Sequence, residues 1–159
     1  MNNFQRNGSI SNSQVGINFE RLVFDYFFNN EIRLEKNKVV NIGLHSQKEH
    51  TFDLGNEDII VECKSHKWTE SQKVPSGKIR NWNEAMFLFY LSPKRYKKYF
   101  VVENDYNQRR TQSLLEYYID KYYHLIPEDV VLFDFYIESK FCDIYEYDHK
   151  IMKHIKRNV

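Results

Sequence analysis

Two carboxylates and a lysine lie close together in the stretch 51–65, TFDLGNEDIIVECKS. Asp53 is followed after eight residues by Glu62, and Lys64 comes two residues later. In an extended strand, residues two apart point to the same face, so Glu62 and Lys64 should project together. A turn near Gly55 would fold the strand that carries Asp53 back beside them. The spacing therefore predicts two carboxylates and an ammonium group at one place on a sheet.

Like charges are costly to bury together unless a cation binds between them. Mg²⁺ prefers carboxylate and carbonyl oxygens and keeps several waters, and Mn²⁺ accepts the same ligands. We expect Asp53, Glu62 and the backbone carbonyl of Cys63 to supply three ligands and to leave positions for a phosphate and a water. The metal would polarise the phosphate and activate the water, while Lys64 would orient the water or stabilise developing charge. The predicted chemistry is phosphodiester hydrolysis.

The same pattern has a simpler interpretation, because charged residues are common at strand ends. It would then be a solvated strand end with an internal ion pair. Three histidines lie nearby in the sequence, His45, His50 and His66, but they lack a spacing typical of a transition-metal site. The surrounding elements favour the catalytic interpretation over the simpler one.

Hydrophobic periodicity and turn residues predict those elements. Ser13 and Ser76 are candidate N-caps of the first two helices. Ile59, Val61 and Cys63 should be buried on the face opposite Glu62, so the strand that carries them is central. The expected helices are 13–30, 75–91 and 111–126, and the expected strands are 37–44, 50–54, 58–64, 98–104, 129–138 and 141–148. This order predicts an α/β fold of three αβα layers around a central mixed sheet.

The composition is that of an ordinary globular chain, with 42% hydrophobic and 28% charged residues in 159. We expect a flexible tail over residues 1–12 and a single domain over 13–159. A net charge of +1 predicts no strongly attracted partner, although a local basic patch can still bind nucleic acid. Cys63 and Cys142 form no CxxC pair, and no apolar run approaches about 18 residues. These features predict a cytoplasmic protein with no membrane partner and no organic cofactor.

The arrangement of Asp53 and Glu62-Cys63-Lys64 resembles the signature of the PD-(D/E)XK nuclease superfamily. Phe52 stands where the nominal proline would be, a position that varies in that superfamily. The expected order of elements matches the αβββαβ restriction-endonuclease-like core across about residues 13–138. Segments 62–93 and 113–135 are also similar to an uncharacterised group of bacterial restriction-endonuclease-like proteins. The resemblance implies this fold and a nuclease origin.

Members of the superfamily often add a glutamate from the first helix, which here would be Glu20. On a helical wheel Glu20 lies with Ile17, Phe24 and Phe27, a largely apolar set. A nearby metal or Lys64 would explain a carboxylate in that set. The alternative is an acid at the edge of the buried face that reaches water.

The function expected from these observations is a Mg²⁺-dependent DNA endonuclease in restriction, defence or repair. One alternative is a catalytically silent nuclease-fold protein that binds nucleic acid, and another is a subunit of a larger complex. Because the two strands of DNA are antiparallel and each chain has one site, we expect a homodimer.

Several polar residues are candidates for contacts to the DNA backbone. They are Ser65, directly after the lysine, and Lys78, Arg80 and Asn83 in the second predicted helix. Basic runs at 94–98, 109–110 and 150–157 also suit phosphate contacts. Taken singly, each of these is more often a turn residue or solvated surface.

Overall fold

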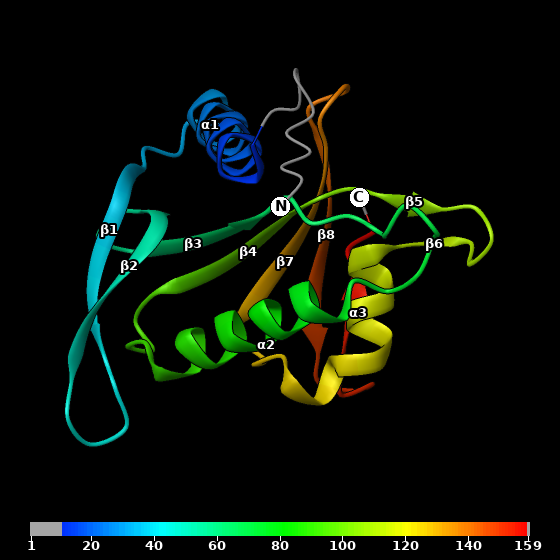
Figure 1. Ribbon diagram of the computed structural model, residues 1–159. Coiled ribbons are helices and arrows are strands. Elements are labelled where there is room, and N and C mark those ends of the chain that lie inside the picture. The colour runs from blue at the N-terminus through cyan, green and yellow to red at the C-terminus, as the bar shows by residue number, and fades with distance from the viewer. Residues whose placement is uncertain (1–10, 159) are drawn as a thin grey trace, which may run out of the picture.

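A computed structural model describes residues 11–158, which form a seven-stranded sheet with helices on both faces and a small separate hairpin (Figure 1). Helices α1, α2 and α3 are Asn12–Asn29, Ser76–Leu91 and Leu114–Tyr122, and a short 3₁₀ helix η1 is Tyr123–Leu125. The first four strands, β1 to β4, are Glu35–Ile42, Lys48–Gly55, Ile59–Lys64 and Lys97–Glu103. Strands β5 to β9 are Tyr106–Asn107, Gln112–Ser113, Val130–Tyr136, Phe141–Asp148 and Lys153–Lys156.

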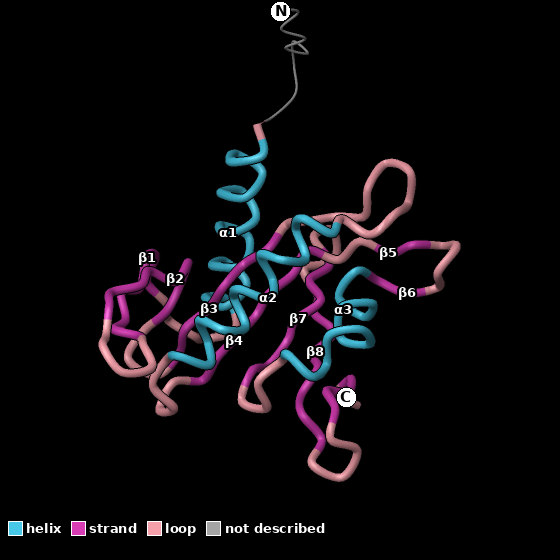
Figure 2. The backbone as a smooth tube through the Cα atoms, turned by 60° about the horizontal axis from the view of Figure 1, so that its bottom comes forward, coloured by secondary structure: helices cyan, strands magenta, loops and turns pink. Residues whose placement is uncertain are grey.

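The large sheet is mixed, with the strand order β1-β2-β3-β4-β7-β8-β9. Its three central strands, β3, β4 and β7, are parallel, and the remaining neighbours are antiparallel. Parallel neighbours need a crossover connection, which α2 supplies between β3 and β4 and α3 supplies between β4 and β7. The antiparallel strands β1 and β2 lie at one end of the sheet, and β8 lies toward the other (Figure 2), where β9 forms the edge. The predicted mixed α/β sheet flanked by helices is confirmed.

Each face of the sheet has its own hydrophobic layer. Helix α1 buries Phe19, Val23 and Phe27, spaced at four residues, against one face. Helices α2 and α3 cover the other face, where Trp82 and Tyr118 are fully buried. The central strands are apolar on both sides because both sides are covered. None of the helices in the described part of the chain is long and apolar enough to span a membrane.

The predicted N-caps of the first two helices are wrong. Helix α1 is capped by Ser11, whose Oγ accepts from the backbone N–H of Gln14 at 3.2 Å. Ser13 is already inside the helix; residue 11 caps α1 and residue 12 begins it, so neither belongs to the expected tail. The rest of that predicted tail, residues 1–10, lies outside the described residues. At α2 the N-cap is Pro75, with no side-chain cap hydrogen bond.

The third predicted helix, 111–126, begins later than its apolar pattern suggests. Residues Gln112–Ser113 pair instead with Tyr106–Asn107 in the separate hairpin. Ser113 then caps α3 through a capping box with Glu116. A short edge strand, Lys153–Lys156, was missed because its sequence lacks the alternation that a half-buried strand shows.

Candidate functional site

The site lies at a fork between β2 and β3. These strands pair only at Leu54 with Val61 and at Gly55 with Ile60. One step further the partners would be Asp53 and Glu62, but these do not pair. From Phe52 to Lys48 β2 pairs only with β1, and Glu62 pairs with Phe100 of β4. The two carboxylates therefore stand where the sheet opens.

One hydrogen bond still joins the strands at the opening. Asp53 Oδ2 accepts from the backbone N–H of Cys63 at 2.7 Å. This contact holds the Asp53 carboxylate against β3, beside the position of Glu62. The predicted approach of Asp53 to the Glu62 strand is therefore present in the structure.

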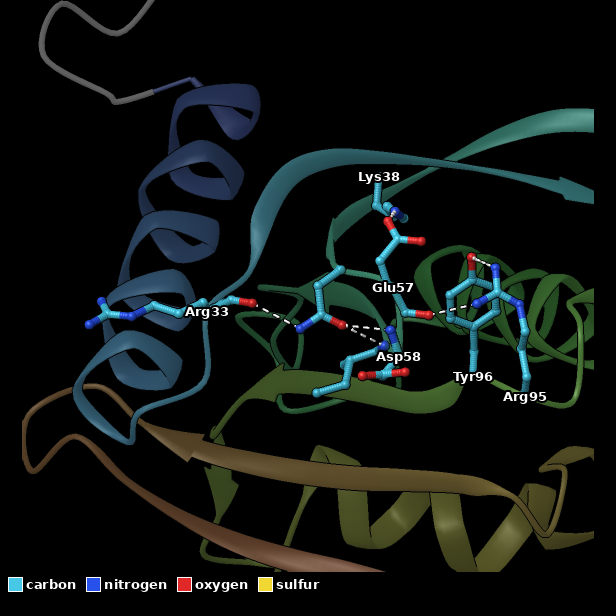
Figure 3. Close-up of polar contacts among 8 residues, drawn as sticks. Arg33, Lys38, Glu57, Asp58, Arg95 and Tyr96 are labelled. Carbon is cyan, nitrogen blue, oxygen red and sulfur yellow. Dashed lines mark hydrogen bonds and ion pairs between the residues drawn. The ribbon is translucent and has the colours of Figure 1, made fainter.

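Asn56 forms the turn that folds the two strands together. Its backbone N–H donates to the carbonyl of Ile59 at 2.8 Å, and its Oδ1 accepts from the N–H groups of Asp58 and Ile59, both at 2.8 Å. Its Nδ2 donates to the backbone carbonyl of Arg33 at 2.9 Å, which ties the turn to the segment after α1 (Figure 3). An asparagine side chain can mimic a backbone turn in this way.

Glu57 is held from two sides in the same turn (Figure 3). Its carboxylate pairs with Lys38 Nζ at 2.8 Å, and its backbone carbonyl accepts from Arg95 Nη1 at 2.7 Å. Arg95 also donates to the Tyr96 hydroxyl at 2.6 Å. The turn is thus fixed to β1 and to the start of β4, which sets the register that places Asp53.

Gly55 is required where β2 meets β3, and we expect Gly55→Ala to destabilise the protein. A Cβ there would lie 2.6 Å from the carbonyl oxygen of Ile59 and 2.8 Å from side-chain carbons of Lys38. Overpacking of this kind costs about 1–3 kcal/mol of unfolding free energy, measurable by urea denaturation. In the control variant Gly77→Ala the added Cβ meets nothing within 4 Å in a helix, so we expect no loss. Equal stability of the two variants would contradict the prediction.

Glu62 and Lys64 project to the same face, as the strand alternation predicts. Lys64 Nζ and Glu62 Oε1 form an ion pair at 2.8 Å, with side chains only 17% and 12% exposed. The other oxygen, Glu62 Oε2, is buried and has no hydrogen-bond partner within residues 11–158. A buried acceptor without a protein partner can accept from a water or bind a cation.

Burial and like charge dominate the electrostatics of the site. Burial and the nearby charge of Glu62 raise the pKa of Asp53 to about 6, although the Cys63 N–H, Lys64 and His50 oppose the shift. Burial alone would lower the pKa of Lys64, but the charge and hydrogen bond of Glu62 outweigh it and raise that pKa. Lys64 therefore remains an ammonium group and is unsuited to act as a base.

Glu20 approaches the site from α1. Burial and the charge of Asp53 raise the pKa of Glu20, while Lys36 and Lys64 lower it, so it lies within electrostatic reach of the cluster. Its predicted apolar surroundings are wrong in part, because Ile17 is 55% exposed. Glu20 is half-buried at the edge of the stripe that packs on the sheet.

The donor set can be tested against a divalent ion. Within residues 11–158, no three His, Cys, Asp or Glu side chains are grouped to hold a metal ion by themselves. Glu20 therefore does not complete a ligand trio with Asp53 and Glu62. Mg²⁺ is commonly bound through one or two carboxylates with waters and substrate phosphates. The orphaned Glu62 Oε2 and the repulsion between the carboxylates fit such an ion.

Only some of the predicted nucleic-acid contacts lie near this cluster. Ser65 and Lys78 line a pocket of about 750 Å³ that also includes Lys64. Arg80 is exposed on α2 and does not line this pocket. Asn83 lies elsewhere, since its Oδ1 accepts from the Tyr118 hydroxyl at 2.9 Å. The structure therefore groups two of the four with the site.

Several residues of the predicted basic runs are engaged within the protein. Lys98 is buried and pairs with Asp129 at 2.6 Å, and Lys153 pairs with Asp120 at 2.8 Å. Arg157 forms an ion pair with Glu146. These side chains stabilise strand ends, so the interpretation as free phosphate contacts is not favoured for them.

Sequence reasoning missed the contribution of His66. Its Nδ1 accepts from Trp82 Nε1 at 2.9 Å, and the residue lines the pocket beside Lys64. The available signal was its place two residues after Lys64, which continues the same side of the chain just past β3.

Comparison of the chain with protein-family models, with curated proteins and with solved structures gave no match.

Proposed function

We propose that the protein is a metal-dependent DNA endonuclease of the PD-(D/E)XK type. The observation that carries the proposal is the fork at which Asp53, Glu62 and Lys64 meet on neighbouring strands. A mixed sheet with α1 on one face and α2 on the other supports an αβββαβ core. The orphaned Glu62 oxygen supports Mg²⁺, with Mn²⁺ as a substitute.

Each residue has a distinct role in the proposal. Asp53 and Glu62 bind the cation, together with the backbone carbonyl of Cys63. When bound, the cation lowers the pKa of a water and neutralises charge on the phosphate. Lys64, a permanent cation here, donates hydrogen bonds to the phosphate oxygens or orients the attacking water. Glu20 adds negative charge from the α1 side and assists in positioning water.

The proposed partner is the phosphate backbone of DNA, and the proposed assembly is a homodimer. One chain carries one fork, whereas cleavage of both antiparallel strands needs two sites related by a two-fold axis. Analytical ultracentrifugation with and without duplex DNA would measure this directly. A mass of one chain without DNA, and of one chain per duplex with DNA, would contradict the dimer and leave nicking of single strands as the activity.

A cleavage assay tests the proposed function. We expect purified protein with Mg²⁺ or Mn²⁺ to cut supercoiled, single-stranded or branched DNA, and Asp53→Ala to remove the cutting because a carboxylate of the cluster is lost. Asp58→Ala is a matched control, since this acid is exposed at the turn of the same hairpin. Activity of Asp53→Ala equal to that of the wild type would overturn the proposal.

Two observations favour the silent alternative. Glu62 is already paired with Lys64, and no ligand trio of side chains exists among the described residues. Such a protein would bind nucleic acid without binding metal. Calorimetric titration with Mn²⁺ separates the two functions, because the endonuclease requires heat of binding that Asp53→Ala abolishes.

A further inference from the structure

A pocket of about 750 Å³ opens where the end of β3 meets the first turns of α1 and α2. Its charged and polar lining side chains include Lys64, Ser65, His66, Lys67, Lys78 and Asn81. None of the described residues that line it is acidic. Because Lys64 belongs both to this pocket and to the ion pair with Glu62, the pocket adjoins the proposed catalytic site.

The positive charge of the pocket is only partly balanced by the protein. Lys64 pairs with Glu62, and Lys67 pairs with Glu103 at 2.7 Å. Lys78 forms no ion pair with any residue in 11–158. One ammonium group is therefore left for an anionic ligand.

His66 adds a hydrogen-bond donor whose state is fixed by Trp82. The indole Nε1 carries a hydrogen and can only donate, so His66 Nδ1, 2.9 Å away, must accept. In a neutral imidazole the proton then sits on Nε2. Burial and the charges of Lys64 and Lys78 lower the pKa of His66 to about 4, which keeps the ring neutral near physiological pH.

The His66 donor is free to meet a ligand. Its Nε2 forms no hydrogen bond with the described residues and is not among their buried unpartnered atoms. A neutral donor gives direction to a hydrogen bond, whereas the flexible Lys78 acts as a point charge. Together they suit a ligand that is anionic and rich in acceptor oxygens, which is the chemistry of a phosphodiester.

We propose that this pocket binds the phosphate next to the one held at the Asp53–Lys64 cluster, through the ammonium group of Lys78 and Nε2–H of His66. This inference rests on the proposed function, because it takes the ligand to be a nucleic-acid strand. Two adjacent phosphates held in this way prevent the nucleic-acid strand from sliding along its own length. The phosphodiester bond that lies at the Asp53–Lys64 cluster is therefore the one that is cut.

Binding without metal tests the pocket separately from cleavage. The probe is a short fluorescein-labelled single-stranded DNA in EDTA, followed by fluorescence anisotropy over a series of salt concentrations. We expect His66→Phe to weaken binding about tenfold or more, because a hydrogen bond to a charged group is lost. Since the lost donor is neutral, the slope of log K against log salt should stay unchanged.

Lys78→Ala should behave differently from His66→Phe. Loss of one phosphate-bound cation lowers the magnitude of the salt slope by about 0.7 on single strands. His66→Gln keeps an acceptor for Trp82 and an amide donor, so near wild-type affinity is expected. Lys121→Ala, exposed on α3, is the control for a general charge effect and should leave the affinity nearly unchanged.

Three results would each overturn the inference. They are an unchanged affinity of folded His66→Phe, a salt-slope change in His66→Phe as large as that in Lys78→Ala, and a wild-type His66 that ¹⁵N NMR shows to be protonated on Nδ1. Thermal unfolding shows whether His66→Phe is folded. If it is not, the affinity of His66→Gln and the tautomer of His66 test the inference in its place. Cleavage by the wild type with normal binding by His66→Phe rejects the pocket alone. His66-dependent binding without any cleavage supports the pocket and rejects the hydrolytic function.

Discussion

Lys64→Met is expected to lose cleavage and stability together, whereas Glu62→Gln/Lys64→Met regains only stability. The single change removes the partner of Glu62 and leaves a mostly buried carboxylate unpaired. Breaking such a pair costs about 3 kcal/mol of unfolding free energy. The uncharged glutamine in the double variant removes that cost. Cleavage stays at least about a hundredfold to a thousandfold below the wild type, because the cationic donor to the phosphate and the Glu62 carboxylate are both absent.

Chemical denaturation and a cleavage assay on the same samples measure both effects. Lys38→Met is the matched control, since its partner Glu57 is exposed and an exposed ion pair contributes less than about 1 kcal/mol. Recovery of cleavage in the double variant would show that the Glu62–Lys64 pair serves the fold and that neither side chain is needed for the chemistry. Equal stability of Lys64→Met and the wild type would show that Glu62 does not need its partner.

Asp134→Asn is expected to change how stability depends on pH. Asp134 is 1% exposed in β7, and burial raises its pKa to about 6, although the Ser113 hydroxyl donates to Oδ2 at 2.5 Å and opposes the shift. The folded state thus binds the proton more tightly than the unfolded state, where the pKa is near 3.8. The stabilisation is complete below that value and is lost as pH rises through about 6.

The asparagine variant carries no charge at this position at any pH. Its stability relative to the wild type should therefore rise by about 3 kcal/mol between acidic and neutral pH, the equivalent of a shift of about two pKa units. Urea denaturation at several pH values measures the difference. Parallel curves for wild type and Asp134→Asn would contradict the prediction.

The sequence contained the alternation and turn that bring Asp53 to Glu62 and Lys64, because strand geometry and the Gly55–Asn56 turn are local. The order of helices and long strands was predictable for the same reason. Both predicted helix caps failed. At α1 two nearby serines compete and only the folded backbone decides which hydroxyl reaches an amide, and at α2 no side chain caps the helix. The edge strand at 153–156 depends on pairing with β8 and has little signal of its own.

The surroundings of the site were less predictable than its central residues. The pairing of His66 with Trp82 joins residues from the loop after β3 and from α2, and no spacing encodes it. The absence of Asn83 from the site depends on where Tyr118 lies in α3. A helical wheel placed Glu20 in an apolar set, but it does not show which residues of the helix the sheet covers, and Ile17 is exposed.

The fork has a mechanical consequence. Asp53 belongs to the two-stranded arm of β1 and β2, which pairs with the rest of the sheet at only two residue pairs, whereas Glu62 and Lys64 belong to the parallel centre. About half of the arm is exposed, although Phe52 and Leu54 are buried. Segments with few buried contacts open at lower free energy than the core. The two carboxylates are thus carried by an end and by the centre of the sheet, so a local opening of the arm would separate them. A cation bound by both carboxylates would hold the arm against the centre of the sheet.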